Sequence, residues 1–369
     1  MSRRILLSIG RDSSIGTVGS PLYQRMQTYE QSHTFIQIVM AVGEPRELQI
    51  GTCRIYLTGG AHLASAFWNA LSAAVRIART EPVDIVTTQD VLYAGVVGYL
   101  VSYRFSLPLF VQLHGDYLDN PLWFASQVGR LNRVMNIVGK YILRRATSVR
   151  AVSARLRTQL IAQFGIDEKR VHSIPIGTDL NIFAKGTDAA RVKRLVFVGR
   201  LLPEKEPLLF CEVAATILTH HPEFTIGIAG DGFMRTAMEA LLTERGVLDR
   251  THFYGNLDLT SVAELYATSF CYIHTAGWEG WGMPMIEAMA AGCPVVTTDS
   301  GCAGEAVRHL DTGMVSPVGD ATALIKNVEI LITDSNLWHK IVASGRTESV
   351  VWSATNLTDK LVKWYESDK

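Results

Sequence analysis

The sequence predicts an α/β protein made of two doubly wound, Rossmann-like domains, and three observations support this. Short runs rich in Val, Ile and Leu alternate with longer helical patterns from end to end. Continuous apolar strands separated by helices are typical of parallel sheets covered on both faces. The chain has 369 residues, more than one hydrophobic core usually serves. We therefore expect two domains facing each other across a ligand-binding cleft, beyond the carboxyl ends of their strands.

The elements follow in order. In the first half, strands are predicted at residues 5–9, 35–40, 54–57, 84–87, 109–113, 149–152 and 171–174, with helical patterns over 61–79, 91–104 and 127–145. In the second half, strands are predicted at 195–198, 225–229, 252–254, 271–274 and 295–298. The aperiodic segment 175–194 predicts the boundary between domains spanning 1–178 and 179–369. The last helix, 354–366, could pack back on the first domain.

Composition limits the class of protein. Lys plus Arg equal Asp plus Glu, 35 against 35, so no net field attracts nucleic acid. Five scattered cysteines without a C-x-x-C spacing indicate a reducing compartment and no zinc cluster. The N-terminus lacks the features of a signal peptide, and the apolar stretch 91–103 is too short to span a bilayer. We expect a cytoplasmic protein, with peripheral attachment to the inner face of the cell membrane left open.

The most informative stretch runs from Gly277 to Ser300, with the sequence GWEGWGMPMIEAMAAGCPVVTTDS. Its first glycines predict a loop whose backbone can approach a ligand closely, and Pro284 suits the first turn of a following helix. Free N–H groups and the helix dipole favour a phosphate at such a helix N-terminus. A tight turn without a ligand is the alternative.

Two carboxylates frame this loop, Glu279 within it and Glu287, which we expect in the first turn of the helix. A carboxylate beside a phosphate is electrostatically unfavourable unless it accepts hydrogen bonds from hydroxyls. Sugar and ribose hydroxyls are the obvious donors. Glu287 could also do no more than favour the helix N-terminus.

Two cations, Arg200 and Lys205, follow the strand predicted at 195–198, in the sequence VGRLLPEKE. They thereby lie at the carboxyl end of a strand, where ligands of such sheets bind. Breaking a glycosyl–phosphate bond puts negative charge on the departing diphosphate, and cations held in a dry cleft stabilise that charge in the transition state. A solvated surface pair is the commoner fate of such residues.

Taken together, these motifs resemble glycosyltransferase family 4, whose members are retaining enzymes of the two-domain GT-B architecture. The resemblance rests on Gly199-Arg200 with Lys205, the Gly230-Asp231-Gly232 turn, and the spacing of Glu279 and Glu287. It implies that Arg200 and Lys205 hold the donor diphosphate, while Glu279 binds the transferred sugar and Glu287 the ribose. Further donor contacts are implied at Gly199, Gly230, Asp231, Asn256, Leu257, Gly280, Trp281, Gly282 and Met283. The family often has Phe at the position of Trp281, so its indole could alter the donor sugar pocket.

The first domain also resembles the family, in the form of enzymes that assemble bacterial surface polysaccharides. The resemblance lies in TTQD at 87–90 and VQLHGDYLDNPLW at 111–123. It implies that His114 lies near the transferred sugar and acts in catalysis, with a packed core histidine as the alternative. Asp116 could contact the acceptor or merely form a turn. Gly16 would meet the donor phosphates, although the adjacent glycines usual in the family are absent.

Two further features concern metals and membranes. No D-x-D pair or His/Cys/Asp cluster has metal-ligand spacing, so we expect no metal and no other cofactor. Residues 121–160 contain eight basic residues and no acidic one, with apolar residues at helical spacing. The basic stretch 130–157 could lie on an anionic membrane or receive a polyprenyl-linked acceptor, or be a solvated face.

The motifs and the resemblance together predict a metal-independent glycosyltransferase, and the resemblance implies that it retains the anomeric configuration. It would move a sugar from a UDP- or GDP-linked donor to a glycan or lipid-linked hydroxyl acceptor in polysaccharide or glycoconjugate biosynthesis. Two alternatives stay open: a nucleotide-sugar epimerase of the same fold, which would convert the donor without an acceptor, and a non-catalytic sugar-nucleotide binding protein.

Overall fold

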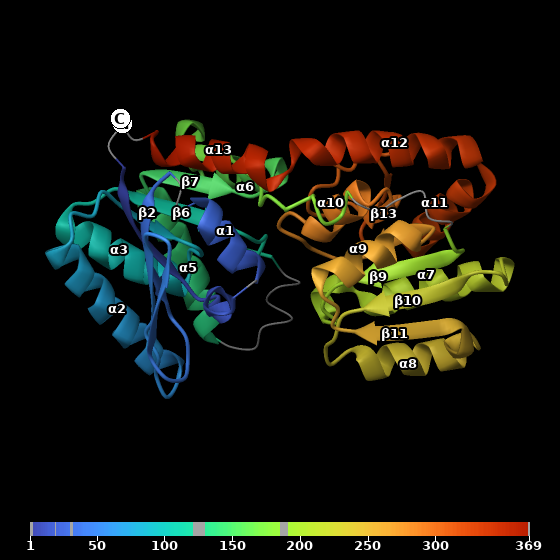
Figure 1. Cartoon of the computed structure of the whole chain (residues 1–369), viewed down its shortest axis with the longest axis horizontal. Coiled ribbons are helices and arrows are strands. Elements are labelled where there is room, and N and C mark those ends of the chain that lie inside the picture. The colour runs from blue at the N-terminus through green and yellow to red at the C-terminus, as the bar shows by residue number, and fades with distance from the viewer. Residues whose placement is uncertain (1–2, 19, 30–31, 121–129, 185–190, 368–369) are drawn as a thin grey trace. The chain divides into compact units, whose positions relative to one another are not determined.

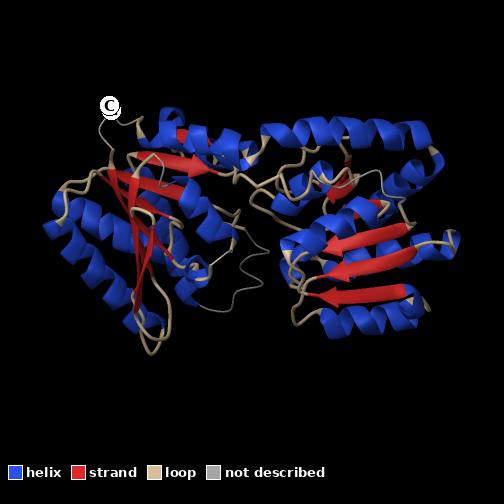
Figure 2. Cartoon of the chain, in the orientation of Figure 1, coloured by secondary structure: helices blue, strands red, loops and turns tan. Residues whose placement is uncertain are grey.

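The chain divides into two compact units, Met1–Pro175 with Leu357–Lys369, and Ile176–Asn356 (Figure 1). The computed structural model describes residues 3–18, 20–29, 32–120, 130–184 and 191–367, without the side chains of Pro21 and residues 130–132. In each unit the strands gather in one sheet flanked by helices, as Figure 2 shows. The predicted pair of α/β domains is confirmed.

The first unit contains an eight-stranded sheet in the order β3-β4-β2-β1-β5-β6-β7-β8. Its strands are β1 (Ile5–Gly10), β2 (Thr34–Val39), β3 (Arg46–Ile50), β4 (Cys53–Leu57), β5 (Ile85–Thr88), β6 (Leu109–Leu113), β7 (Ser148–Ala151) and β8 (Val171–Ser173). Its helices include α1 (Pro21–Tyr29), α2 (Leu63–Thr80), α3 (Tyr93–Phe105), α5 (Arg130–Arg145) and α6 (Ala154–Ala162). All seven strands predicted for this half are present. The described helix α5 begins at Arg130, and the predicted helical residues 127–129 lie outside the described residues.

Strand β3 departs from the prediction, which contained neither this strand nor an antiparallel pair. Its sequence RELQI is mostly exposed and lacks an apolar run, so hydrophobic patterning gives no signal there. It pairs antiparallel with β4, from Arg46 opposite Leu57 to Ile50 opposite Cys53. This hairpin closes one edge of an otherwise parallel sheet.

Helix α13 (Ala354–Tyr365) completes the core of the first unit, to which residues from Leu357 onward belong. Leu361, Trp364 and Tyr365 are buried in the same cluster as Phe110 of β6, and the rings of Trp364 and Phe110 lie 4.9 Å apart. The Trp364 indole donates a hydrogen bond to Ser148 Oγ at 2.7 Å. The C-terminal segment therefore folds with the N-terminal sheet.

The second unit contains a six-stranded sheet in the order β11-β10-β9-β12-β13-β14, all parallel. The strands are β9 (Arg194–Val198), β10 (Thr225–Ala229), β11 (Thr251–Gly255), β12 (Cys271–His274), β13 (Val295–Thr298) and β14 (Met314–Ser316). The helices are α7 (Pro207–His220), α8 (Arg235–Glu244), α9 (Leu259–Thr268), α10 (Met283–Ala290), α11 (Ala321–Thr333) and α12 (Ser335–Val351). Of the described strands in this unit, only β14 is missing from the prediction.

The described residues contain no helix long and apolar enough to cross a membrane.

Candidate active site

The loops that follow β9, β10 and β11 meet at the carboxyl edge of the second sheet. Gly199 N donates to Ala229 O at 3.0 Å, Leu201 N to Asp231 O at 2.9 Å, and Gly230 N to Gly255 O at 2.7 Å. The structure therefore brings together the glycines and Asp231 that the sequence singled out. Asn256 and Leu257 follow at the end of β11, and Asn256 is exposed.

A buried ion pair lies at the same edge. Lys205 ends a 3₁₀ turn after β9, and its ammonium binds the carboxylate of Glu279, in the loop after β12. The two side chains are 16% and 17% exposed. Burial opposes ionisation of Glu279, but Lys205, His274 and the N–H of Gly280 outweigh it and lower the pKa of Glu279. The pair is thus charged and largely shielded from water.

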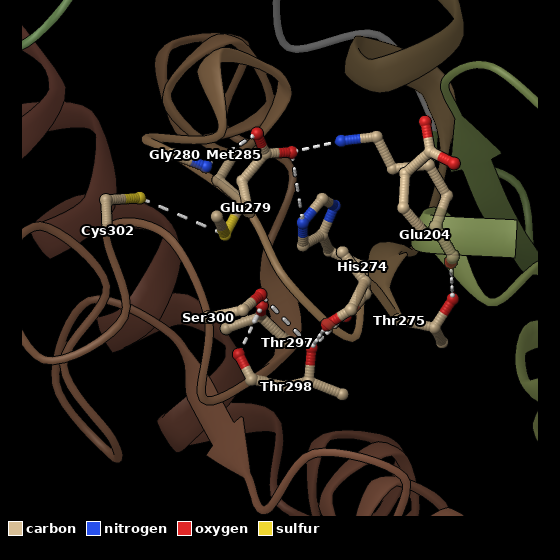
Figure 3. Close-up of polar contacts among 12 residues, drawn as sticks. Glu204, His274, Thr275, Glu279, Gly280, Met285, Thr297, Thr298, Ser300 and Cys302 are labelled. Carbon is tan, nitrogen blue, oxygen red and sulfur yellow. Dashed lines mark hydrogen bonds and ion pairs between the residues drawn. The ribbon is translucent and has the colours of Figure 1, made fainter. Parts of the chain in front are cut away.

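Sequence reasoning missed His274, the last residue of β12. Its Nε2 lies 3.9 Å from Glu279 Oε2 and has no hydrogen-bond partner among the described residues (Figure 3). Its Nδ1 lies 2.8 Å from the hydroxyl of Tyr272. Burial, and then the charge of Lys205, lower the pKa of His274 to about 4, so the imidazole is neutral at neutral pH. A histidine ending a buried strand five residues before Glu279 was the available signal.

The loop that carries Glu279 is fixed by hydrogen bonds on both sides. Thr275 Oγ1 donates to the carbonyl of Lys205 at 2.8 Å, and Thr298 Oγ1 to that of Ala276 at 2.7 Å (Figure 3). Further along, Cys302 N donates to the carbonyl of Trp281 at 2.8 Å. These bonds hold the loop of Glu279 beside the turn that carries Lys205.

The loop opens onto the N-terminus of α10, as predicted. Gly282 is the N-cap residue with φ of 90°, and Pro284 lies in the first turn. The backbone N–H groups of Trp281, Gly282 and Met283 donate no hydrogen bond within the described part of the chain, whereas the N–H of Gly280 donates to Glu279 Oε1 at 3.1 Å. Three donors and the helix dipole can therefore receive an anion.

The indole of Trp281 is not a pocket-lining group. It is 2% exposed, and its ring lies 4.9 Å from that of Trp352, at the end of α12. The expectation that this side chain shapes a donor sugar pocket is therefore revised. It can act on a ligand only by holding the loop whose backbone carries the N–H groups.

Arg200 is placed differently from Lys205. Its side chain is 69% exposed and pairs with Glu204 at 3.1 Å. Glu204 is itself 12% exposed, and its carbonyl accepts a hydrogen bond from Gly277 N at 3.1 Å. The guanidinium is thus tethered beside the loop of Glu279 while its face stays open to solvent.

Glu287 lies in the second turn of α10, as its fifth residue, and not in the first turn as we expected. The helix begins at Met283, one residue before Pro284, which moves Glu287 from the fourth to the fifth helical position. The carboxyl is partly buried, and burial raises the pKa of Glu287 to about 7. The group is therefore poised between its neutral and charged forms near neutral pH.

Replacing Glu287 by glutamine is expected to change how stability depends on pH. Because the folded-state pKa of about 7 lies above the ordinary 4.5, the folded protein binds this proton more tightly than the unfolded chain does. Its contribution to stability is fully present below pH 4.5 and is lost as the pH rises through about 7. Urea unfolding across this range should show wild type losing stability relative to Glu287→Gln. The control is Glu264→Gln on the exposed side of α9, and parallel curves for wild type and Glu287→Gln would contradict the prediction.

In the first unit, His114 follows β6 and its Nε2 lies 3.1 Å from Gln89 Oε1. Burial, and then the charges of Arg150 and Arg25, lower the pKa of His114 to about 3. The imidazole is neutral at physiological pH, with one nitrogen that donates a hydrogen bond and one that accepts. Sequence reasoning did not single out Gln89, although TTQD contains it.

The other two site residues expected in the first unit, Asp116 and Gly16, are partly buried. Burial raises the pKa of Asp116, whose Oδ1 has no hydrogen-bond partner among the described residues. Gly16 ends a 3₁₀ turn, and a Cβ added there would lie 3.4 Å from Leu48 and 3.6 Å from Leu57. Gly16 therefore packs against the β3–β4 hairpin. Gly19, in the same loop, lies outside the described residues.

Comparison with known proteins gives matches over both units. Residues 180–348 match the family model of glycosyl transferases group 1, and residues 37–177 that of the glycosyl transferase 4-like domain. The glycogen synthase of Mycobacterium tuberculosis is 28% identical over 256 residues, which are 68% of this chain and 60% of that protein. The chain thus spans about three fifths of that relative. The 2-deoxystreptamine glucosyltransferase of Streptomyces kanamyceticus is 25% identical over 90% of this chain and 87% of its own length.

Solved structures share the fold. Sucrose-phosphate synthase from Thermosynechococcus elongatus has a TM-score of 0.81 at 18% identity, covering 99% of this chain and 98% of that one. Anabaena HepE in complex with UDP and glucose has a TM-score of 0.77 at 20% identity, covering 99% of this chain and 100% of that one. At such identities the likeness concerns the fold.

Proposed function

Because this chain belongs to the family 4 glycosyltransferases of the GT-B type, we propose that it transfers a sugar from a nucleoside diphosphate sugar to a hydroxyl. The acceptor would be a glycan or a lipid-linked sugar, and the anomeric configuration would be retained. One observation carries the proposal: the largely shielded Lys205–Glu279 pair joins the turn after β9 to the loop that leads into α10. The N–H groups at the start of that helix donate to no described residue. Cation, anion site and carboxylate thus share one loop system.

Each charged or hydrogen-bonding group of this loop system has a role in the proposed transfer. As the bond from the anomeric carbon to the phosphate breaks, charge grows on the diphosphate, and Lys205, Arg200 and the N–H groups of α10 stabilise it. Glu279, kept ionised by Lys205, accepts hydrogen bonds from hydroxyls of the transferred sugar. Glu287 accepts from the ribose, and residues around Asn256 meet the base. A diphosphate oxygen would take the proton of the incoming hydroxyl.

For His114 we propose the role implied by the family resemblance, a hydrogen-bonding group near the transferred sugar. Its lowered pKa supports a neutral donor or acceptor of hydrogen bonds. A role in holding positive charge is not supported. Asp116 is proposed to contact the acceptor, consistent with the unpaired oxygen that it retains.

Uridine diphosphate is the first donor nucleotide to test. The structural neighbour HepE has been crystallised with UDP and with UDP-glucose, and one relative is named a glucosyltransferase. We propose that transfer needs no metal, since the positive groups at this edge can neutralise the diphosphate. Turnover that disappears in EDTA and returns with magnesium or manganese would refute this part.

The experiment is a thermal-shift panel of UDP, GDP, ADP and CMP without metal, on wild type and Arg200→Ala. A ligand at about 100 times its dissociation constant stabilises the native state by about 2.7 kcal/mol, enough for a clear shift. One nucleoside diphosphate should shift wild type and shift the variant much less. The control is Lys193→Ala, which removes an exposed ion pair with Glu223 at the opposite end of β9 and should shift like wild type. If no nucleotide shifts wild type, the proposal fails.

A further inference from the structure

The surface of helices α3 and α5 in the first unit exposes an unusual number of large apolar side chains. Five of them form what we call the α3–α5 face: Leu100, Tyr103, Val134, Ile137 and Tyr141, between 42% and 78% exposed. The two helices pack against each other (Figure 1). On α5 the three residues recur at helical spacing, which places them on one side of the helix.

Aromatic contacts make the face continuous. The rings of Tyr141 and Tyr99 lie 5.7 Å apart, with their hydroxyls at 3.3 Å. Tyr99 in turn stacks on Tyr103 at 6.2 Å. The apolar residues of α5 therefore join those of α3 in one patch, and contiguous exposed apolar patches mark interaction sites.

The charged residues on these two helices are all positive. Neither helix contains an acidic residue. Arg104, Arg133 and Arg145 are exposed and form no ion pair with an acidic residue that the structure describes. The Arg145 guanidinium lies 5.2 Å from the centre of the Tyr141 ring. Cations at the rim of an aromatic surface suit a partner that is apolar inside and negatively charged outside.

Within the wider basic stretch 130–157, only the part that forms α5 contributes to this face. Arg150 is 3% exposed and its Nη1 donates to Gln112 Oε1 at 2.6 Å, so it belongs to the core. Lys140 pairs with Asp119 at 2.5 Å, and Arg157 with Glu168 at 2.8 Å. Arg150 therefore contributes nothing to a membrane surface, and Lys140 and Arg157 are already paired with carboxylates. The side chain of Arg130 lies outside the described residues.

We propose that the α3–α5 face docks the first unit on an anionic lipid bilayer. Tyrosine and aliphatic side chains would enter the interfacial region while the arginines meet lipid phosphates. Charge complementarity and the interleaving of aromatic and basic residues favour this partner over a second copy of the chain, whose identical face would bring like charges together. The face belongs to the first unit and the donor loops belong to the second, so docking does not depend on the proposed transfer reaction.

The test is cosedimentation with vesicles of phosphatidylcholine alone and vesicles in which a third of the lipid is phosphatidylglycerol. Wild type should bind only the anionic vesicles, and more weakly as salt is raised. The double variant Arg133→Gln/Arg145→Gln should bind at least about tenfold more weakly, since each basic residue contributes about fivefold. The double variant Tyr103→Ser/Ile137→Ser should also bind at least about tenfold more weakly, because it removes apolar area that would enter the bilayer interface. The control Val350→Ser removes a 60% exposed apolar side chain from α12 of the other unit and should bind like wild type.

Folding and donor binding are checked separately, by the nucleotide-induced thermal shift, which all these variants should retain. Equal recovery in the supernatant with both vesicle types would overturn the proposal, as would binding that neither double variant weakens. Sedimentation velocity tests the alternative partner for this face, a second copy of the chain. If wild type is a dimer that Tyr103→Ser/Ile137→Ser dissociates, and vesicles are not bound, the face is a self-association surface and the proposal is wrong.

Discussion

Replacing Lys205 by methionine is expected to lower the rate of sugar transfer by about 10²–10³-fold and to destabilise the second unit. The ammonium is the buried partner of Glu279. Its loss removes positive charge from the departing diphosphate and leaves a carboxylate in a shielded position without compensation. Breaking one partner of a buried pair costs about 3–5 kcal/mol; we expect the lower end, because both side chains keep some exposure.

The double variant Lys205→Met/Glu279→Gln separates the two effects. Removing both charges should recover most of the lost stability, because no unpaired ion remains. Activity should stay low, because neither the diphosphate cation nor the sugar-binding carboxylate is restored. Urea unfolding and initial rates of transfer measure the two quantities on the same set of proteins. Equal loss of stability in the single and double variants would contradict the pairing argument.

The destabilisation by Lys205→Met should also depend on pH with a defined sign. The pKa of Glu279 is lowered in the folded protein, so its stabilising contribution is present above the ordinary value of 4.5 and is lost as the pH falls through the folded-state pKa. The gap between wild type and Lys205→Met should therefore close in acid. Lys193→Met, which breaks an exposed pair, should change neither stability nor rate measurably. Full turnover in Lys205→Met would end its assignment to the diphosphate.

Hydrophobic patterning predicted the buried parallel strands of both units because their runs are apolar on both faces. It missed β3, whose sequence RELQI is polar and mostly exposed and whose pairing depends on the turn to β4. Charged residues at strand ends were also predictable. Since parallel strands share one carboxyl edge, Arg200, Lys205 and Glu279 had to lie on the same side of the sheet.

Contacts set by packing were not predictable from spacing. In the sequence His274 is only one more residue of a buried strand, and the structure alone places its ring beside Glu279. The burial of the Trp281 ring against Trp352 depends on helix α12, far along the chain. The open face of Arg200, against the shielded Lys205, is likewise a result of tertiary structure. Sequence fixes the types of group at the site, and packing decides which of them become buried partners.

Substituting alanine for Gly230 is expected to cost more than about 3 kcal/mol of stability in the second unit, from backbone strain and steric overlap together. Gly230 has φ of 126°, and a Cβ built on it would lie 1.9 Å from the carbonyl oxygen of Gly199. No side-chain rotation can relieve this contact, because both atoms are fixed to the backbone. The loops after β9 and β10 would have to separate, breaking the bond from Gly199 N to Ala229 O.

The matched control is Gly246→Ala. Gly246 also has a positive φ, 68°, but nothing lies within 4 Å of an added Cβ. It should therefore show backbone strain alone, about 1–2 kcal/mol, and retain the nucleotide-induced thermal shift. Gly230→Ala should lose that shift even at temperatures where it remains folded. The added Cβ would displace Gly199, and Arg200 is the next residue in the chain. Equal destabilisation by the two substitutions would mean that the loops can part freely, and the donor edge would then not be the rigid platform on which the proposed chemistry depends.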